Sequence, residues 1–228
     1  MKIPHWFCWD YLTQYHGEKH QSYFDAYTII QAIKGKEFNG FLRVKFEDNK
    51  IVDFYHKDSD KIVQIILEHV GLNLLPLIVS QDIDLMPIPN SDMIPNSGGE
   101  HKIIKSVQKI LSAYHSVKQP YTVRLNPGLR WTSPKTPSHQ SPGSRSMLHY
   151  EGKLALTTAD PRPIILFDDV YTSGSQAKAA TKFLTGAGHT VLGVLTLAKT
   201  TNMPRPHAYE WREDVCEYDD TPFSWANF

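Results

Sequence analysis

The second half of the chain alternates between apolar runs and amphipathic segments, and this pattern limits the fold more than any other feature. The strand-like runs lie at residues 83–89, 121–125, 163–170 and 190–199. Between them, residues 99–115 and 175–188 repeat apolar side chains at helical spacing. Strands that are apolar along most of their length are typical of a parallel sheet with helices on both faces. We therefore predict an α/β fold with a mainly parallel central sheet flanked by helices.

The first 80 residues show a different pattern. Residues 22–35 and 58–71 each predict a helix that ends at a glycine, and residues 41–55 alternate in the manner of a β-hairpin. We expect residues 1–80 to form a small N-terminal hood over the carboxyl edge of the sheet. The core then spans residues 81–200, and residues 201–228 form an acidic, aromatic tail.

One segment of the core has no periodicity. Residues 126–152 contain four prolines and three glycines. A long segment without regular structure inside a compact domain is usually a functional lid or a disordered stretch. We expect a long flexible loop here.

The composition narrows the classes of function. The chain carries 24 Lys and Arg against 24 Asp and Glu, so its bulk charge does not indicate nucleic-acid binding. It has no apolar run of 18 residues and no apolar signal segment, and we expect a cytoplasmic protein that does not enter a membrane.

The two cysteines, Cys8 and Cys216, indicate no disulfide framework. His16 and His20 lie four residues apart but lack further ligands at suitable spacing, so we interpret them as ordinary polar histidines.

The segment "PIILFDDVYTSGSQ" (163–176) contains the candidate functional site. An apolar strand ends in two adjacent carboxylates, Asp168 and Asp169, and a turn of small residues (172–175) leads into a helix. Such a turn can direct backbone N–H groups at a phosphate, with the positive end of the helix dipole behind them. Vicinal carboxylates beside a phosphate suit the hydroxyls of a ribose 5-phosphate and a divalent cation. The alternative is a helix-capping turn whose acids are simply solvated.

This segment resembles a known signature. "IILFDDVYTSGSQ" is similar to the phosphoribosyl-pyrophosphate (PRPP) binding signature of type I phosphoribosyltransferases, and within them the chain is most similar to the ComF-type, competence-associated group. The flanking matches are "IDLMPIP" (83–89), "TPSHQSPGSRS" (136–146) and "TVLGVLTLAKT" (190–200). The chain departs from that group in two places. It has only Cys8 where ComF-type proteins carry a zinc ribbon, and "NSDMIPNSGGEHK" (90–102) replaces their usual Arg-Gly-Phe-Asn-Gln run.

The resemblance implies roles for the residues that match. Asp168 and Asp169 would bind the ribose 2- and 3-hydroxyls, directly or through water on Mg²⁺, and so act in catalysis and as metal ligands through water or substrate. The implied 5-phosphate site consists of Tyr171, Thr172, Ser173, Gly174 and Ser175. The implied pyrophosphate loop consists of Asn90, Ser91 and Asp92.

The long loop would supply further cations. Lys135 and Arg145 are the candidate catalytic residues there, and Arg130 and His139 are additional positive or titratable groups of the same loop. Closure of this loop would bring positive charge to the leaving pyrophosphate and exclude water. The alternative is that these are ordinary solvated loop charges.

The function implied is the transfer of ribose 5-phosphate from PRPP to a nitrogen acceptor, a nucleobase or related compound, with Mg²⁺ as cofactor and release of pyrophosphate. Two alternatives stay open: a catalytically silent PRPP-binding regulator, and an accessory protein of DNA uptake or defence that acts through a partner. A homodimer, or a protein partner bound through the tail, is also left open.

Overall fold

A computed structural model of the chain describes residues 2–12, 21–45, 51–90, 93–94, 101–133, 150, 152–158, 160–201 and 212–217, with only the backbone at residues 22, 44 and 45. The elements, in chain order, are β1 (Lys2–Leu12), α1 (Gln21–Lys34), β2 (Phe41–Lys45), β3 (Ile51–Tyr55), the 3₁₀ turn η1 (His56–Asp58), α2 (Ser59–His69), the π-helical turn η2 (Val70–Leu74), α3 (Leu75–Ile78), β4 (Ile83–Pro87), α4 (Lys102–His115), β5 (Val123–Leu125), β6 (Leu129–Trp131), β7 (Leu154–Leu156), β8 (Ile164–Tyr171), α5 (Ser175–Gly186), β9 (Val191–Thr201) and β10 (Arg212–Glu217).

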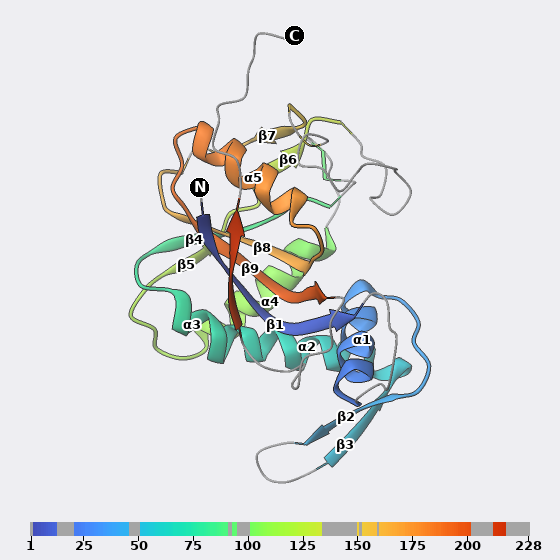
Figure 1. The fold of residues 1–228 in the computed structure, drawn as a ribbon. Coiled ribbons are helices and arrows are strands. Elements are labelled where there is room, and N and C mark those ends of the chain that lie inside the picture. Colours follow the sequence, from blue (N-terminus) through green and yellow to red (C-terminus); the bar gives the residue numbers. More distant parts are fainter. Residues whose placement is uncertain are drawn as a thin grey trace.

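The centre of the molecule is a sheet with the strand order β10-β1-β9-β8-β4-β5. The pairs β1–β9, β9–β8, β8–β4 and β4–β5 are parallel, and the edge strand β10 is antiparallel to β1. Helix α5 covers one face, while α2 and α4 cover the other (Figure 1). The predicted fold class, α/β with a mainly parallel sheet flanked by helices, is confirmed.

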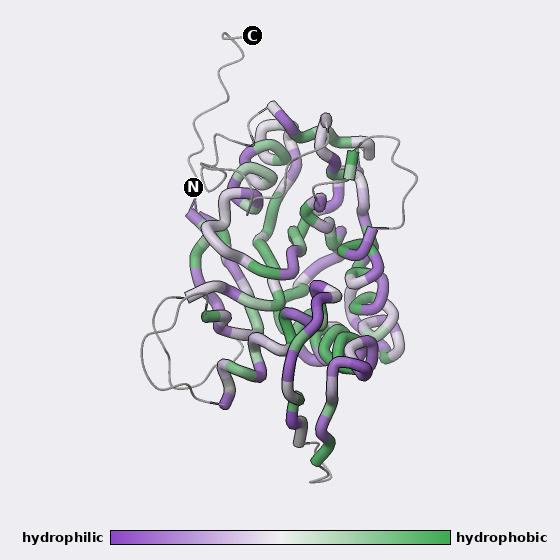
Figure 2. Tube along the Cα trace, turned by 90° about the vertical axis from the view of Figure 1, so that its right-hand side faces the viewer, coloured by the Kyte–Doolittle hydropathy of each residue, from purple (hydrophilic) through white to green (hydrophobic). Residues whose placement is uncertain are grey.

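Strand β8 shows why the sheet is buried on both faces. Ile165 and Phe167 pack in the core cluster that contains α1, α2 and α4, whereas Ile164 and Leu166 pack in the cluster that contains α5, β6 and β7. Successive side chains of a strand point to opposite faces, so a strand between two helical layers must be apolar at every position. Figure 2 shows hydrophobic residues gathered along these central strands.

The helical run at residues 56–78 packs closely against α4. A Cβ on Gly71 would lie 2.2 Å from the carbonyl oxygen of Ile110. The two helices can therefore pack this closely only because residue 71 is a glycine. By length and composition this run would also pass for a membrane span. Its side chains Ile62, Leu67 and Val70 are nevertheless buried in the core.

The two ends of the described chain join the central sheet. Strand β1, which the sequence analysis placed within the hood, lies between β9 and β10, and β10 comes from the predicted tail. Helix α1 lies beside the carboxyl ends of β1 and β9, and the β2–β3 hairpin extends away from the sheet (Figure 1). The predicted hairpin at residues 41–55 is confirmed. The division of the chain at residues 80 and 200 stays a prediction.

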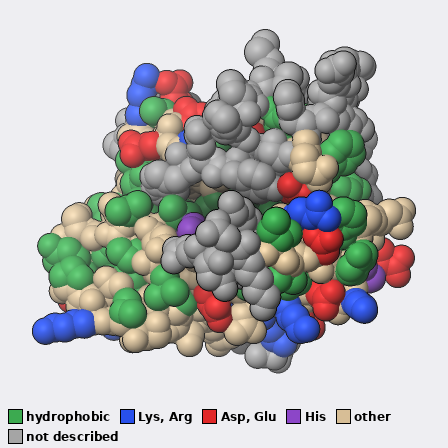
Figure 3. Space-filling view, turned by 90° about the horizontal axis from the view of Figure 1, so that it is seen from below, with side chains coloured by type: hydrophobic (Ala, Val, Ile, Leu, Met, Phe, Trp, Pro, Cys, Tyr) green, Lys and Arg blue, Asp and Glu red, His purple; other side chains and the backbone are tan. Residues whose placement is uncertain are grey.

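Acidic and basic side chains are interspersed on the described surface visible in Figure 3, where they do not form a single basic stripe. This distribution agrees with the balanced charge of the sequence.

Candidate functional site

The turn between β8 and α5 has a backbone that only glycine adopts easily. Gly174 has φ +71°, and a Cβ on it would lie 2.1 Å from the Tyr171 hydroxyl oxygen. Ser173 Oγ and Ser175 Oγ are 2.7 Å apart, and α5 begins at Ser175. Thr172 and Ser173 are exposed. The turn therefore offers hydroxyls at the N-terminus of a 12-residue helix, which is a suitable position for an anion.

The acidic pair comes just before this turn. Asp168 and Asp169 are both partly buried, and the Asp169 backbone N–H donates to Asp168 Oδ1 at 2.8 Å. Burial raises the pKa of Asp168 well above its usual range, and the negative charge of Asp169 raises it further. A bound cation would lower this electrostatic cost.

Two lysines from other elements lie near the acids. The positive charge of Lys34, the last residue of α1, lowers the pKa of Asp168 and so partly offsets the rise that burial causes. Lys102, the first residue of α4, has a pKa lowered by partial burial and raised in turn by Asp169 and Asp60. Sequence reasoning missed both lysines, because neither lies near the signature in the chain.

Lys102 lies close to the end of α1. A Cβ on Gly35 would lie 2.9 Å from Lys102 Nζ, so the ammonium group lies against the carboxyl end of that helix. Carbonyl groups at a helix C-terminus attract a cation. The ammonium group thus lies between two sources of negative charge, the helix end and the acidic residues.

Tyr171 supports the turn from inside the protein. Its ring stacks on His5 with the centroids 4.0 Å apart, and its hydroxyl is hydrogen bonded to Cys216. Burial raises the pKa of Tyr171, so the phenol stays neutral. The described side chain therefore lies beneath Gly174, and the assignment of Tyr171 to the phosphate site stays a prediction.

The turn after β4 lies at the same edge of the sheet. Pro87 of β4 pairs with Phe167 of β8, and the Ile88 N–H donates to the Phe167 carbonyl at 2.8 Å. Asn90 follows, partly buried, and its carbonyl accepts from the Met93 N–H at 3.0 Å. Asn90 thus follows β4, and the acidic pair lies near the carboxyl end of the adjacent parallel strand β8. In such sheets, ligands bind at the carboxyl ends of the strands.

Several predicted residues lie outside the described part of the chain. They are Ser91, Asp92, Lys135, His139 and Arg145. Arg130 is described: its Nη1 donates to the Leu129 carbonyl at 3.0 Å, and burial lowers its pKa.

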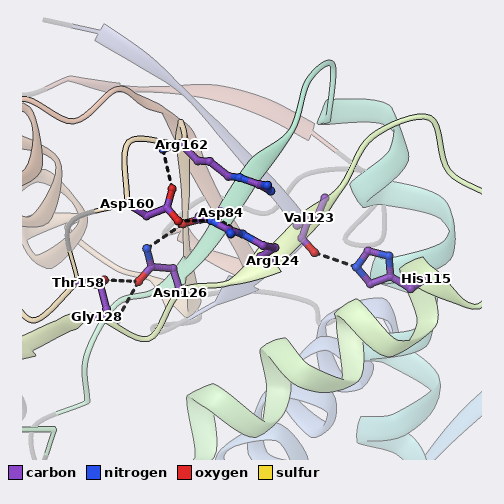
Figure 4. Close-up of polar contacts among 9 residues, drawn as sticks. All are labelled: Asp84, His115, Val123, Arg124, Asn126, Gly128, Thr158, Asp160 and Arg162. Atoms are coloured by element: carbon purple, nitrogen blue, oxygen red, sulfur yellow. Dashed lines mark hydrogen bonds and ion pairs between the residues drawn. The ribbon is translucent and has the colours of Figure 1, made fainter.

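A polar network ties the start of the long loop to the sheet (Figure 4). The buried Asp84 accepts from Arg124 at 3.1 Å and from Asn126 Nδ2 at 2.8 Å. Arg124 also pairs with Asp160, and Thr158 Oγ1 donates to Asn126 Oδ1 at 2.8 Å. These contacts satisfy a buried carboxylate and fix residues 124–126 on the adjacent strand and turn.

The residues present fit a magnesium ion held by few protein ligands. Mg²⁺ prefers oxygen ligands and keeps several waters, and the vicinal carboxylates supply such oxygens close to the turn at Gly174. Within the described residues, no three His, Cys, Asp or Glu side chains form a metal-binding group.

No family model matches the sequence, and no curated protein does. Among solved structures, the chain is similar to a hypoxanthine phosphoribosyltransferase from Staphylococcus aureus in two crystal forms. The orthorhombic form is 8% identical with a TM-score of 0.37, covering 75% of this chain and 76% of that one. The tetragonal form is 10% identical with a TM-score of 0.38, covering 76% of each chain. Orotate phosphoribosyltransferase from Francisella tularensis is 11% identical with a TM-score of 0.33, covering 72% of this chain and 78% of that one. All of these TM-scores are low, so we argue the function from the chain's own residues.

Proposed function

We propose that the chain is a type I phosphoribosyltransferase that transfers ribose 5-phosphate from PRPP to a nitrogen acceptor of the nucleobase class and releases pyrophosphate. The observation that carries this proposal is the order of groups at one edge of the sheet. The vicinal acids Asp168 and Asp169 lie near the end of β8, a glycine turn leads from that strand into α5, and Asn90 follows the neighbouring β4.

Each group has a role in binding PRPP. The hydroxyls and N–H groups of residues 172–175 would bind the 5-phosphate at the start of α5. Asp168 and Asp169 would accept hydrogen bonds from the two ribose hydroxyls. Asn90, together with Ser91 and Asp92, would contact the pyrophosphate. The half-buried acids and the phosphate turn are adjacent in sequence, so both ends of a ribose 5-phosphate fall within reach of one short segment.

The reaction is a substitution at C1 of the ribose. The acceptor nitrogen forms a bond to C1 and gives up its proton to water, while the bond from C1 to the pyrophosphate oxygen breaks and its electron pair leaves with the pyrophosphate. Positive charge develops on the ribose, and the carboxylates of Asp168 and Asp169 stabilise it. Asp168 and Asp169 would hold Mg²⁺ through water or substrate oxygens, and the ion would supply positive charge that offsets the charge of the phosphates. Lys135 and Arg145 are proposed to neutralise the leaving group as well, and no covalent intermediate is required.

The first experiment measures PRPP binding and consumption. Purified protein with Mg²⁺ and PRPP is incubated with a panel of purine and pyrimidine bases, and pyrophosphate release is followed. We expect turnover with at least one base. PRPP that binds in calorimetry but is never consumed would identify the chain as the silent regulator instead.

The second experiment tests the site itself. We expect Asp168→Asn combined with Asp169→Asn to weaken Mg²⁺–PRPP binding by roughly a hundredfold, because two carboxylates leave the ribose site. Asp53→Asn is the control, because Asp53 lies on the β2–β3 hairpin and pairs with Arg43. Unchanged PRPP affinity in the double variant would overturn the assignment of the site.

A further inference from the structure

Trp131 joins both ends of the turn that holds Asn90. Its indole Nε1–H donates to the Pro89 carbonyl at 2.9 Å, and its backbone N–H donates to the Met93 carbonyl at 2.8 Å. The two carbonyls flank Asn90 on either side. Because one residue binds both carbonyls, Pro89 and Met93 are each tied to β6, a strand some forty positions further along the chain.

The turn needs such support because one proline ends β4 and a second follows two residues later. Pro87 and Pro89 have no N–H, and the Ile88 N–H makes the bond to Phe167 that is the last between these strands among the described residues. Pro89 is buried, so its carbonyl requires a partner inside the protein. The indole of Trp131 supplies it.

Trp131 is itself held firmly. Its side chain is 1% exposed and packs against the ring of Tyr150, with the centroids 5.6 Å apart. Its strand β6 pairs with β7 through Leu154, and the Thr132 N–H donates to the Lys153 carbonyl at 2.9 Å. A side chain that is held by burial, ring packing and strand pairing can position the group that it binds.

We propose that Trp131 is a positioning residue for the pyrophosphate half of the site, acting through the Pro89 carbonyl on the turn at Asn90. This inference rests on the proposed function. The 5-phosphate half is built from a different segment, residues 171–175, with Gly174 against Tyr171. Loss of the indole donor should therefore weaken binding of pyrophosphate while sparing binding of ribose 5-phosphate.

The test is Trp131→Phe, which keeps an aromatic ring and the backbone bond to Met93 but removes the indole N–H. Isothermal titration in Mg²⁺ measures PRPP, inorganic pyrophosphate and ribose 5-phosphate separately. We expect the Kd for PRPP and for pyrophosphate to rise about tenfold, and the Kd for ribose 5-phosphate to change less than about twofold.

Trp6→Phe is the matched control. The Trp6 indole donates to Glu213 at 3.1 Å, between β1 and β10, so this change also removes one indole hydrogen bond from a nearly buried tryptophan. We expect it to leave the affinities for all three ligands unchanged, even if it lowers Tm as much as Trp131→Phe does.

The outcomes separate the two proposals. Trp131 has no positioning role if Trp131→Phe leaves the affinities for PRPP and pyrophosphate unchanged, or if it weakens the binding of ribose 5-phosphate by the same factor. In either case the proposed function stands. If the unmodified protein binds neither PRPP nor ribose 5-phosphate, the proposed function fails, and this inference fails with it.

Discussion

The Asp168 carboxylate lies near the end of β8 with a second carboxylate beside it, and burial and that charge together raise its pKa. Asp168 therefore opposes folding when it is ionised, because its charged form is less stable in the folded chain than in the unfolded one. The destabilisation is complete above the folded-state pKa and disappears as the pH falls through the unfolded-state value. A residue kept at such a cost is typical of a ligand-binding site.

We expect Asp168→Asn to raise Tm at pH 7.5 in the absence of Mg²⁺ by about 2–4 °C, the shift that roughly 1 kcal/mol produces in a chain of this length. An asparagine Oδ1 can still accept from the Asp169 N–H, so the turn keeps that bond. Differential scanning calorimetry checks the shift. A lower Tm in the variant would show that the carboxylate stabilises the fold.

His5 is a buried histidine on the face of β1 that contacts the site turn. Its Nε2 lies 2.9 Å from Thr196 Oγ1, and its ring stacks on Tyr171 and Phe7. Its pKa falls from 6.5 to about 3, chiefly because the ring is buried; the charge of Lys199 adds to this fall and Asp214 partly offsets it. His5 is therefore neutral in the folded chain, while in the unfolded chain it takes up a proton below about pH 6.5.

The folded chain keeps its full free energy of unfolding, as far as His5 is concerned, above pH 6.5. It loses part of that free energy as the pH falls from there toward about 3, because only the unfolded chain protonates His5. We expect the unfolding free energy to fall by up to about 1.4 kcal/mol per pH unit in this range because of His5. His5→Gln can keep the contact to Thr196 but does not titrate. Urea unfolding at pH 7 and pH 5 should show a smaller loss for the variant, and an identical loss would contradict the role of His5.

At the scale of elements, the turn between β8 and α5 depends on Gly174. An alanine there would need φ near +71° and would place its Cβ 2.1 Å from the Tyr171 hydroxyl oxygen. We expect Gly174→Ala to cost about 2 kcal/mol or more of unfolding free energy and to weaken ribose 5-phosphate binding about tenfold. Urea unfolding and calorimetry measure the two effects.

Gly186→Ala is the control for this substitution. Gly186 ends α5, and a Cβ on it would meet no atom within 4 Å. Alanine is the better helix residue, so we expect this variant to gain about 0.5–1 kcal/mol and to bind ribose 5-phosphate normally. Equal effects of the two substitutions would show that Gly174 is not special to the turn.

The elements predicted from sequence are those whose signal is local. The apolar runs at residues 83–89 and 163–170 and the helical stripe at 99–115 correspond to β4, β8 and α4, because periodicity and glycine ends are readable within one segment. The signature likewise placed the acids and the glycine turn together. Strand β1 and strand β10 were not predicted as sheet strands, because their pairing joins residues about 200 positions apart.

The same limit applies to the site. Lys34 and Lys102 act on the acidic pair only because α1 and α4 converge on the end of β8. Trp131 supports the turn after β4 through a contact 42 residues away. Such tertiary neighbours leave no local pattern, so a motif can identify the groups that bind a ligand but not the groups that hold them.

At the scale of the whole molecule, β10 completes the sheet at the edge beside β1. Arg212 Nη1 donates to Asp10 Oδ2 at 2.7 Å, and Asp10 is 1% exposed. Lys199 of β9 forms an ion pair with Asp214, which also lies on the edge strand β10. The segment after residue 201, which the sequence analysis treated as a tail, thus includes a strand of the central sheet.

We therefore expect a chain that ends at Thr201 to be less stable than one that ends at Glu217. The shorter chain loses β10 and leaves Asp10 without Arg212, and removing one member of a buried ion pair costs about 3–5 kcal/mol. It also exposes the free edge of β1, which can pair with other chains. Thermal unfolding should show a Tm lower by roughly 10 °C in the shorter chain, and size-exclusion chromatography should show its aggregation. The chain ending at Glu217 keeps β10 and is the control; equal Tm values for the two would mean that β10 contributes little to the sheet.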